Sequence, residues 1–198
     1  MSTELAEHSV LGLDKFLIRK NFWTLFGAKF RIFNMQEGLV ATSVQKAFKL
    51  KEDIRVFSDE AMSVELLTMK GRKVIDFSSA YDIVDATTQE KVGAIRRKGM
   101  KSILKDEWQI LDNQDGVIGA IREDSAGMAF LRRFLTNLIP QTFYIELNGE
   151  QLGSIKQMFN PFIFKAVMDL TPDTERKIDR RLAVGATVLL LAIEGRQG

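Results

Sequence analysis

The chain has 198 residues, of which 45% are hydrophobic and 27% are charged, a balance typical of a globular domain rather than of a disordered segment. A formal net charge of +2 is too small to indicate a nucleic-acid-binding protein. The absence of cysteine excludes disulfides, thiolate metal sites and cysteine nucleophiles. We expect a single domain over residues 1–198 that has no nucleic-acid partner.

The N-terminal residues 1–12 carry glutamates and lack the basic and apolar runs of a secretory signal, so we predict a loosely held segment and a cytoplasmic protein. The only histidine, His8, lies in this segment and is interpreted as a solvated residue rather than as a base or metal ligand. The longest uncharged apolar stretch, Leu182 to Ile193, is shorter than the about 20 residues that a helix needs to cross a bilayer. We therefore expect no transmembrane span.

Most of the chain consists of short runs that alternate between apolar and polar residues and are rich in β-branched and aromatic side chains, the pattern of half-buried strands. Glycine-containing turn signals, such as Asp115-Gly116 and Asn148-Gly149, separate many of the runs. About twelve strands are predicted, at 15–20, 28–34, 53–59, 63–69, 73–77, 80–85, 91–96, 107–112, 116–123, 142–147, 151–157 and 162–170.

Three predicted hairpins look like copies of one unit. In each first strand an aromatic residue and an Ile two positions later share a face, and in each return strand a Gly and an Ile two positions later do so. Such a glycine allows a neighbouring aromatic ring or backbone to approach closely. Repeated hairpins imply a continuous sheet with a common interior. The copies begin at Tyr81, Trp108 and Phe143, and Phe30 opens a fourth, degraded copy.

Two segments break the strand pattern. Residues 126–139 place leucines and a phenylalanine on one helical face and end at Pro140, so we predict an amphipathic helix. It plugs or covers a barrel end, and the alternative is that it lies on a bilayer. The C-terminal helix is predicted over 176–194 and is capped from Thr171 to Thr174. From Leu182 to Ile193 it has no polar face apart from Thr187, so this part must be surrounded by protein. About twelve strands leave room for one helix, so the predicted fold is mainly β: a closed antiparallel barrel around a buried C-terminal hydrophobic helix.

Three further segments carry a family resemblance: 96–102 leading to Trp108, the aromatic turn at 159–162, and 179–182 at the start of the last helix. With the run of hairpins, they resemble the LURP-one-related and phospholipid-scramblase-like proteins of the Tubby C-terminal superfamily. The resemblance implies a twelve-stranded barrel around a central C-terminal helix, in agreement with the pattern of the residues. Tubby-like domains are associated with phosphoinositide binding, and scramblases with calcium and membranes, so the resemblance suggests these roles by analogy only.

The strongest local charge signal is the stretch 96–105, which holds five cations among apolar residues. Such a segment suits an anionic lipid headgroup, with its apolar side chains dipping below the headgroup level. The alternative is a solvated connection between two hairpins. The predicted lipid- or phosphate-binding residues are Arg96, Arg97, Lys98, Lys101 and Lys105, joined by Arg132 and Arg133 of the amphipathic helix.

Acidic residues gather just before the last helix, where the resemblance places the calcium-binding region of scramblases. Helix capping explains some of them equally well, so we expect no cofactor and keep calcium as the one metal candidate. Arg180 and Arg181 oppose the dipole of the helix they begin, and we interpret them as structural residues held by nearby aspartates. The candidate calcium ligands are Asp169, Asp173, Glu175 and Asp179.

No zinc-protease, phosphate-loop, dinucleotide-binding or nucleophile-elbow motif occurs, so the sequence predicts no enzyme and no catalytic residue. The first hypothesis is a non-enzymatic module that binds an anionic membrane surface or a phospholipid or phosphoinositide headgroup, peripherally at the membrane. The second is a soluble scaffold that binds another protein and no lipid. The third is a calcium-dependent, scramblase-like activity.

Overall fold

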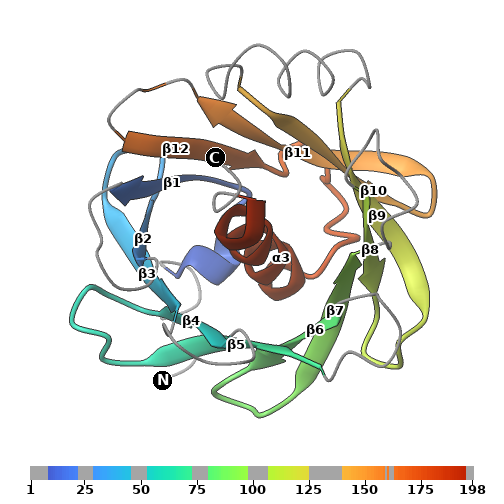
Figure 1. The fold of residues 1–198 in the computed structure, drawn as a ribbon, viewed down its shortest axis with the longest axis horizontal. Helices are drawn as coiled ribbons and strands as arrows, with labels where there is room; N and C mark the ends of the chain where they lie inside the picture. The colour runs from blue at the N-terminus through green and yellow to red at the C-terminus, as the bar shows by residue number, and fades with distance from the viewer. Residues whose placement is uncertain are drawn as a thin grey trace.

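The computed structural model describes residues 9–21, 29–45, 53–72, 80–97, 107–124, 140–158, 160 and 163–194. Within them, twelve strands form one closed antiparallel barrel (Figure 1). The strands are β1 (Lys15–Asn21), β2 (Lys29–Phe33), β3 (Leu39–Gln45), β4 (Asp53–Phe57), β5 (Glu65–Gly71), β6 (Ala80–Asp85), β7 (Lys91–Arg97), β8 (Glu107–Leu111), β9 (Val117–Glu123), β10 (Thr142–Leu147), β11 (Glu150–Met158) and β12 (Ile163–Asp169). A short 3₁₀ turn, η1 (Val10–Gly12), precedes β1, and the helix α3 (Arg180–Glu194) follows β12.

The barrel closes where its first and last strands pair. Strands that are consecutive in the chain are neighbours, and β12 pairs with β1 along the full length of both. The predicted closed barrel of about twelve strands is therefore confirmed, although not every predicted strand is. Residues 73–77 lie outside the described residues, and β3 was not predicted at all. On β3 the buried, inward positions hold Ala41, Ser43 and Gln45, so the usual apolar-inside pattern is missing.

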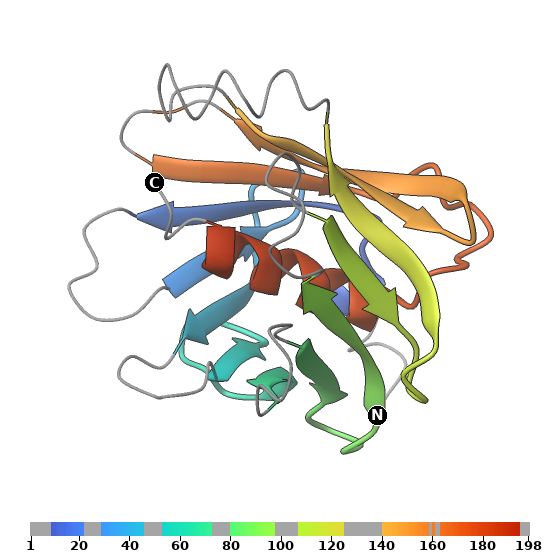
Figure 2. The ribbon, with the colours of Figure 1, turned by 45° about the vertical axis from the view of Figure 1, so that its right-hand side comes forward.

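The helix α3 runs through the barrel and fills its interior (Figures 1 and 2). From Leu182 to Ala192 its residues are buried, and they belong to one core with the inward side chains of the strands. Gly185 allows close contact, because a Cβ atom there would lie 2.8 Å from Cγ2 of Ile83 on β6. The predicted central helix is confirmed. Among the described residues, no helix is long and apolar enough to cross a membrane.

The helix begins at Arg180 and not at 176 as predicted, because the residues before it form a separate turn. Asp179 caps the helix: its carboxylate accepts a hydrogen bond from the backbone N–H of Arg181 at 2.8 Å. Asp173 stabilises the preceding turn by accepting from the backbone N–H groups of Lys177 and Ile178. Two successive aspartate caps therefore replace the single one that was predicted.

Five hairpins share an irregularity at the same place, next to an inward aliphatic residue of the first strand. In the β6–β7 hairpin, for example, Ile83 pairs with Gly93 and Val84 pairs with Lys91, so Val92 is an extra residue. The corresponding extra residues are apolar and lie in the core or against it. Each bulge therefore adds an aliphatic side chain to one end of the interior. The extra residues are Val40, Leu66, Val92, Ile118 and Leu152.

The repeated glycines bring successive hairpins together, as the sequence predicts. Gly93 pairs with Ile83, and a Cβ atom on it would lie 2.5 Å from the carbonyl oxygen of Leu111 on the next hairpin. Gly153 is equally close to the carbonyl oxygen of Asp169 on β12. A methyl group has no space at either position, so the glycines are needed for backbone approach rather than for turn geometry.

Candidate functional site

The two ends of the barrel differ in what they contain. We call the end at which α3 begins the helix-entry end; it holds the hairpin turns, including residues 86–90 between β6 and β7. We call the other the distal end; there β1, β3, β5, β7, β9 and β11 terminate. Of the predicted lipid-binding residues, the structure describes Arg96 and Arg97, and both lie at the distal end.

Arg96 and Arg97 are the last two residues of β7, at the distal end. The Nε–H of Arg96 donates to Oε1 of Gln109, its cross-strand partner on β8, at 2.9 Å. The guanidinium carbon of Arg97 lies 5.6 Å from the ring centroid of Trp108, which is itself 1% exposed. Both arginines are thus held by β8 in defined positions. The other predicted lipid-binding residues, Lys98, Lys101, Lys105, Arg132 and Arg133, lie outside the described residues.

Arg96 differs from the other arginines in its electrostatic surroundings. Among the described residues its guanidinium forms no ion pair, and its hydrogen-bond acceptor is a neutral amide. With Arg97 set aside, every other described arginine has a carboxylate partner within 4.0 Å. These paired arginines are Arg19, Arg31, Arg55, Arg72, Arg122, Arg176, Arg180 and Arg181.

The four acidic residues considered for calcium lie near the helix-entry end, and each is paired with a cation. Asp169 binds Lys15 at 2.6 Å and also accepts from Thr171. Within the part of the chain that the structure describes, no group of three or more histidine, aspartate or glutamate side chains is arranged to hold a metal ion. The remaining pairs are Asp173 with Arg180, Glu175 with Lys177, and Asp179 with Arg181.

Arg180 fixes the start of α3 from inside the protein. Its side chain is 5% exposed and pairs with the fully buried carboxylate of Asp173 and, at 2.8 Å, with Asp14 next to β1. Burial alone raises the pKa of Asp173, but hydrogen bonds from Arg180 and from the backbone of Lys177 and Ile178 more than compensate, so the pKa lies below its ordinary value. The predicted structural role of Arg180 agrees with these contacts.

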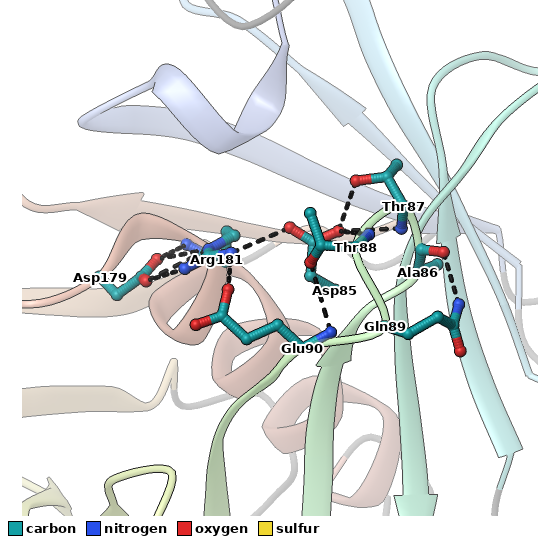
Figure 3. Close-up of polar contacts among 8 residues, drawn as sticks. All are labelled: Asp85, Ala86, Thr87, Thr88, Gln89, Glu90, Asp179 and Arg181. Carbon is teal, nitrogen blue, oxygen red and sulfur yellow. Dashed lines mark hydrogen bonds and ion pairs between the residues drawn. The ribbon is translucent and has the colours of Figure 1, made fainter.

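Arg181 connects the helix to the β6–β7 turn (Figure 3). Its guanidinium pairs with Asp179 at 2.7 Å, with Asp85 at 3.0 Å and with Glu90 at 2.9 Å. Asp85 also accepts hydrogen bonds from Thr87, and with that of Arg181 these outweigh the effect of burial and lower its pKa. The sequence suggests Asp169, Asp173 or Asp179 as partners of Arg180 and Arg181; Asp173 and Asp179 are partners, whereas Asp169 pairs with Lys15. The partners that sequence reasoning missed are Asp14, Asp85 and Glu90. Of these three, only Asp85 could have been suspected from the sequence, because it ends a predicted strand just before a polar turn.

Comparison with known proteins identifies the family of this chain. The family model described as LURP-one-related matches residues 39–190, which is most of the chain. That range runs from β3 through the start of α3 and most of its length. No curated protein and no solved structure matches the chain. The chain therefore belongs to the LURP-one-related family.

Proposed function

We propose that this protein is a non-enzymatic module that binds an anionic membrane surface or a phospholipid headgroup through the distal end of its barrel. It would act in the cytoplasm, peripherally at the membrane. The observation that carries the proposal is the state of Arg96, which is held by Gln109 and has no carboxylate partner among the described residues. A positioned cation without a counter-ion suits an anionic oxygen supplied by a ligand.

Two further features support this assignment. Arg97 lies over the buried indole of Trp108, so the strand end that presents both arginines is anchored in the core. The sequence then continues directly into Lys98, Lys101 and Lys105. Each cation near an anionic leaflet contributes about 1 kcal/mol of attraction, so the five together would give useful affinity without a deep pocket.

Vesicle co-sedimentation tests the proposal. Phosphatidylcholine vesicles with increasing phosphatidylserine content should bind the wild-type protein at low salt, and added salt should release it by screening. Reversing the charges of Lys98, Lys101 and Lys105 should lower binding by orders of magnitude, whereas Arg96→Gln alone should lower it about fivefold. Failure of the wild-type protein to sediment with strongly anionic vesicles at low salt would contradict the proposal.

A matched control lies at the helix-entry end. Lys177→Glu makes the same charge change as one of the reversals and removes only exposed ion pairs with Glu150 and Glu175. Vesicle binding by this variant should stay close to that of the wild-type protein. If Lys177→Glu lowered vesicle binding as much as the same change at Lys98, Lys101 or Lys105, total charge rather than the distal end would govern the interaction.

A second candidate function, a scaffold for another protein, has its own observation. Met62 and Val64 in the β4–β5 turn are 43% and 48% exposed, and Met35 in the β2–β3 turn is 49% exposed. Exposed apolar side chains grouped on neighbouring turns are typical of protein contacts. Met62→Ser with Val64→Ser should then abolish binding to a captured protein partner while leaving vesicle sedimentation unchanged. If the double variant still bound both the protein partner and vesicles, these turns would not be the contact surface.

A further inference from the structure

Three basic residues lie side by side on the outer wall of the barrel. Arg19 of β1 is paired in register with Lys165 of β12 on one side and with Arg31 of β2 on the other. Their neighbours Ile18 and Ala166 are fully buried, so strand alternation directs the three basic side chains outward. We call these three residues the outer basic row. Like charges placed directly opposite each other destabilise a sheet unless an anion lies between them.

The carboxylates near the outer basic row do not balance its charge. Arg19 pairs with Glu37 at 2.6 Å, and Arg31 pairs with Glu60 at 2.7 Å. Glu60 is shared, because Lys29 also binds it at 3.3 Å. Lys165 has no carboxylate partner among the described residues. Lys156, exposed on β11, likewise has none within the described ranges. Lys15 and Asp169, further along β1 and β12, pair with each other, so six described cations share three carboxylates on this wall.

Arg19 is held in a geometry that suits anion binding. Its guanidinium carbon lies 4.7 Å from the ring centroid of Phe33, so the planar group is supported by an aromatic side chain. Its Nε–H is buried and has no hydrogen-bond acceptor within the described part of the chain. Solvent cannot reach this nitrogen, so an anion on the outer wall would contact the exposed part of the guanidinium, whose side chain is 26% exposed. Arginine donors in a fixed plane are the preferred partners of phosphate oxygens.

We propose that Lys165 and Arg19, with Lys156 beside them, form a binding site for a phosphate group. If the phosphate belongs to a lipid headgroup, this inference deepens the proposed function and rests on it. Met158 is 46% exposed and is paired in register with Lys165, so an apolar side chain lies next to the cations, as at a lipid interface. Free phosphate has the same chemistry and would use the same donors.

Titration of the ¹⁵N-labelled protein with inorganic phosphate, followed by NMR at constant ionic strength, tests the site. The largest amide shifts should fall on β12, β1 and β2. Lys165→Gln should weaken phosphate binding about fivefold while leaving the melting temperature unchanged, because Lys165 stabilises no described carboxylate. Lys70→Gln, which removes an exposed lysine from β5 on another wall, is the matched control. Shifts spread evenly over the surface, or equal effects of the two variants, would overturn the site.

Vesicles containing phosphatidylserine identify the source of the phosphate. If Lys165→Gln weakens both phosphate and vesicle binding, the site takes a lipid headgroup; if it weakens phosphate binding alone, the site takes a soluble phosphate. The Arg96→Gln variant separates this inference from the proposed function. In one outcome, Arg96→Gln lowers vesicle binding but Lys165→Gln leaves phosphate binding unchanged. This outcome would support the proposed function and refute the phosphate site at Lys165 and Arg19. In the opposite outcome, phosphate shifts the amide signals of the outer basic row but the protein binds no vesicles. This outcome would support the phosphate site and refute the proposed function.

Discussion

Arg180 and Asp173 form an ion pair that is closed to solvent, with side-chain exposures of 5% and 0%. Such a pair contributes little beyond a well-packed apolar alternative, because both charges lose their hydration. Its geometry nevertheless has a clear role. Arg180 is the first residue of α3, and Asp173 caps the turn before it, so the pair sets where the helix enters the barrel.

Removing one partner of this pair should be strongly destabilising. Asp173→Asn leaves the Arg180 guanidinium buried, with Asp14 as the one remaining carboxylate partner among the described residues. We expect a loss of about 3–5 kcal/mol in the free energy of unfolding. Urea unfolding followed by circular dichroism measures it. Glu175→Gln, at a side chain that is 73% exposed, serves as the control and should change stability by less than about 0.5 kcal/mol. Similar curves for the two variants would rule out a special role for the buried pair.

Asp115 provides a pH-dependent prediction on the outer surface. Hydrogen bonds from Arg72 and then Lys91 lower the pKa of its carboxyl group from 3.8 to about 2. Because the folded-state pKa is depressed, the stabilisation is present above the ordinary value and disappears as the pH falls from about 4 towards 2. Carboxyl ¹³C titration should give a midpoint near 2 in the wild-type protein and a clearly higher one in Arg72→Gln. An unchanged midpoint in that variant would show that the contact is not formed in solution.

The repeated glycines should not tolerate a methyl group. A Cβ atom in Gly93→Ala would meet the backbone of Leu111 and, at 3.0 Å, Cδ1 of Leu182 on the helix, so we expect a loss of about 1–3 kcal/mol. Gly38→Ala in the β2–β3 turn is the control, since its nearest contact is a side-chain atom of Asn34 at 3.1 Å and not the backbone of another strand, so its loss should be smaller. Thermal unfolding should place Gly93→Ala well below both the control and the wild-type protein. Equal melting temperatures would mean that the strands can separate at no cost.

The barrel should not fold without α3. Truncation after Asp179 removes the buried apolar residues from Leu182 to Ala192 and should give unfolded or insoluble protein. A milder test is Leu190→Ala, at a side chain that is 1% exposed, which should cost about 2–5 kcal/mol. Leu190→Asp should be far more damaging than Lys98→Asp. A soluble truncated protein with a cooperative unfolding transition would refute the central position of the helix.

The sequence was sufficient to predict the barrel and its central helix, for reasons that lie in particular residues. A helix that is apolar from Leu182 to Ile193 has no stable position except inside protein, and the alternating runs supply the wall around it. The strand β3 was missed because Ser43 and Gln45 face inward where alternation predicts apolar residues. The alternation of apolar and polar residues in one strand cannot reveal buried polar positions of this kind, because neighbouring strands decide which face is buried.

The polar contacts were less predictable than the fold. Asp85 and Glu90 are distant in sequence from Arg181, and only the closed barrel brings the β6–β7 turn to the start of the helix. The outer basic row is similar: Arg19 and Lys165 become neighbours only because β1 pairs with β12. Charge clusters that arise from strand register leave no run in the sequence, whereas the basic stretch that begins at Arg96 does.

The position of α3 has a consequence for how the protein is made. On the ribosome all twelve strands are synthesised before the helix that covers their inner faces, and the strands at the two ends of the sheet are the last to meet. Until then the nascent chain presents unpaired strands with an apolar face, a state prone to aggregation. Contacts between residues far apart in sequence also slow folding. We therefore expect slow folding that begins only once α3 has emerged, and a yield in cells that depends on chaperones that hold the strands until then.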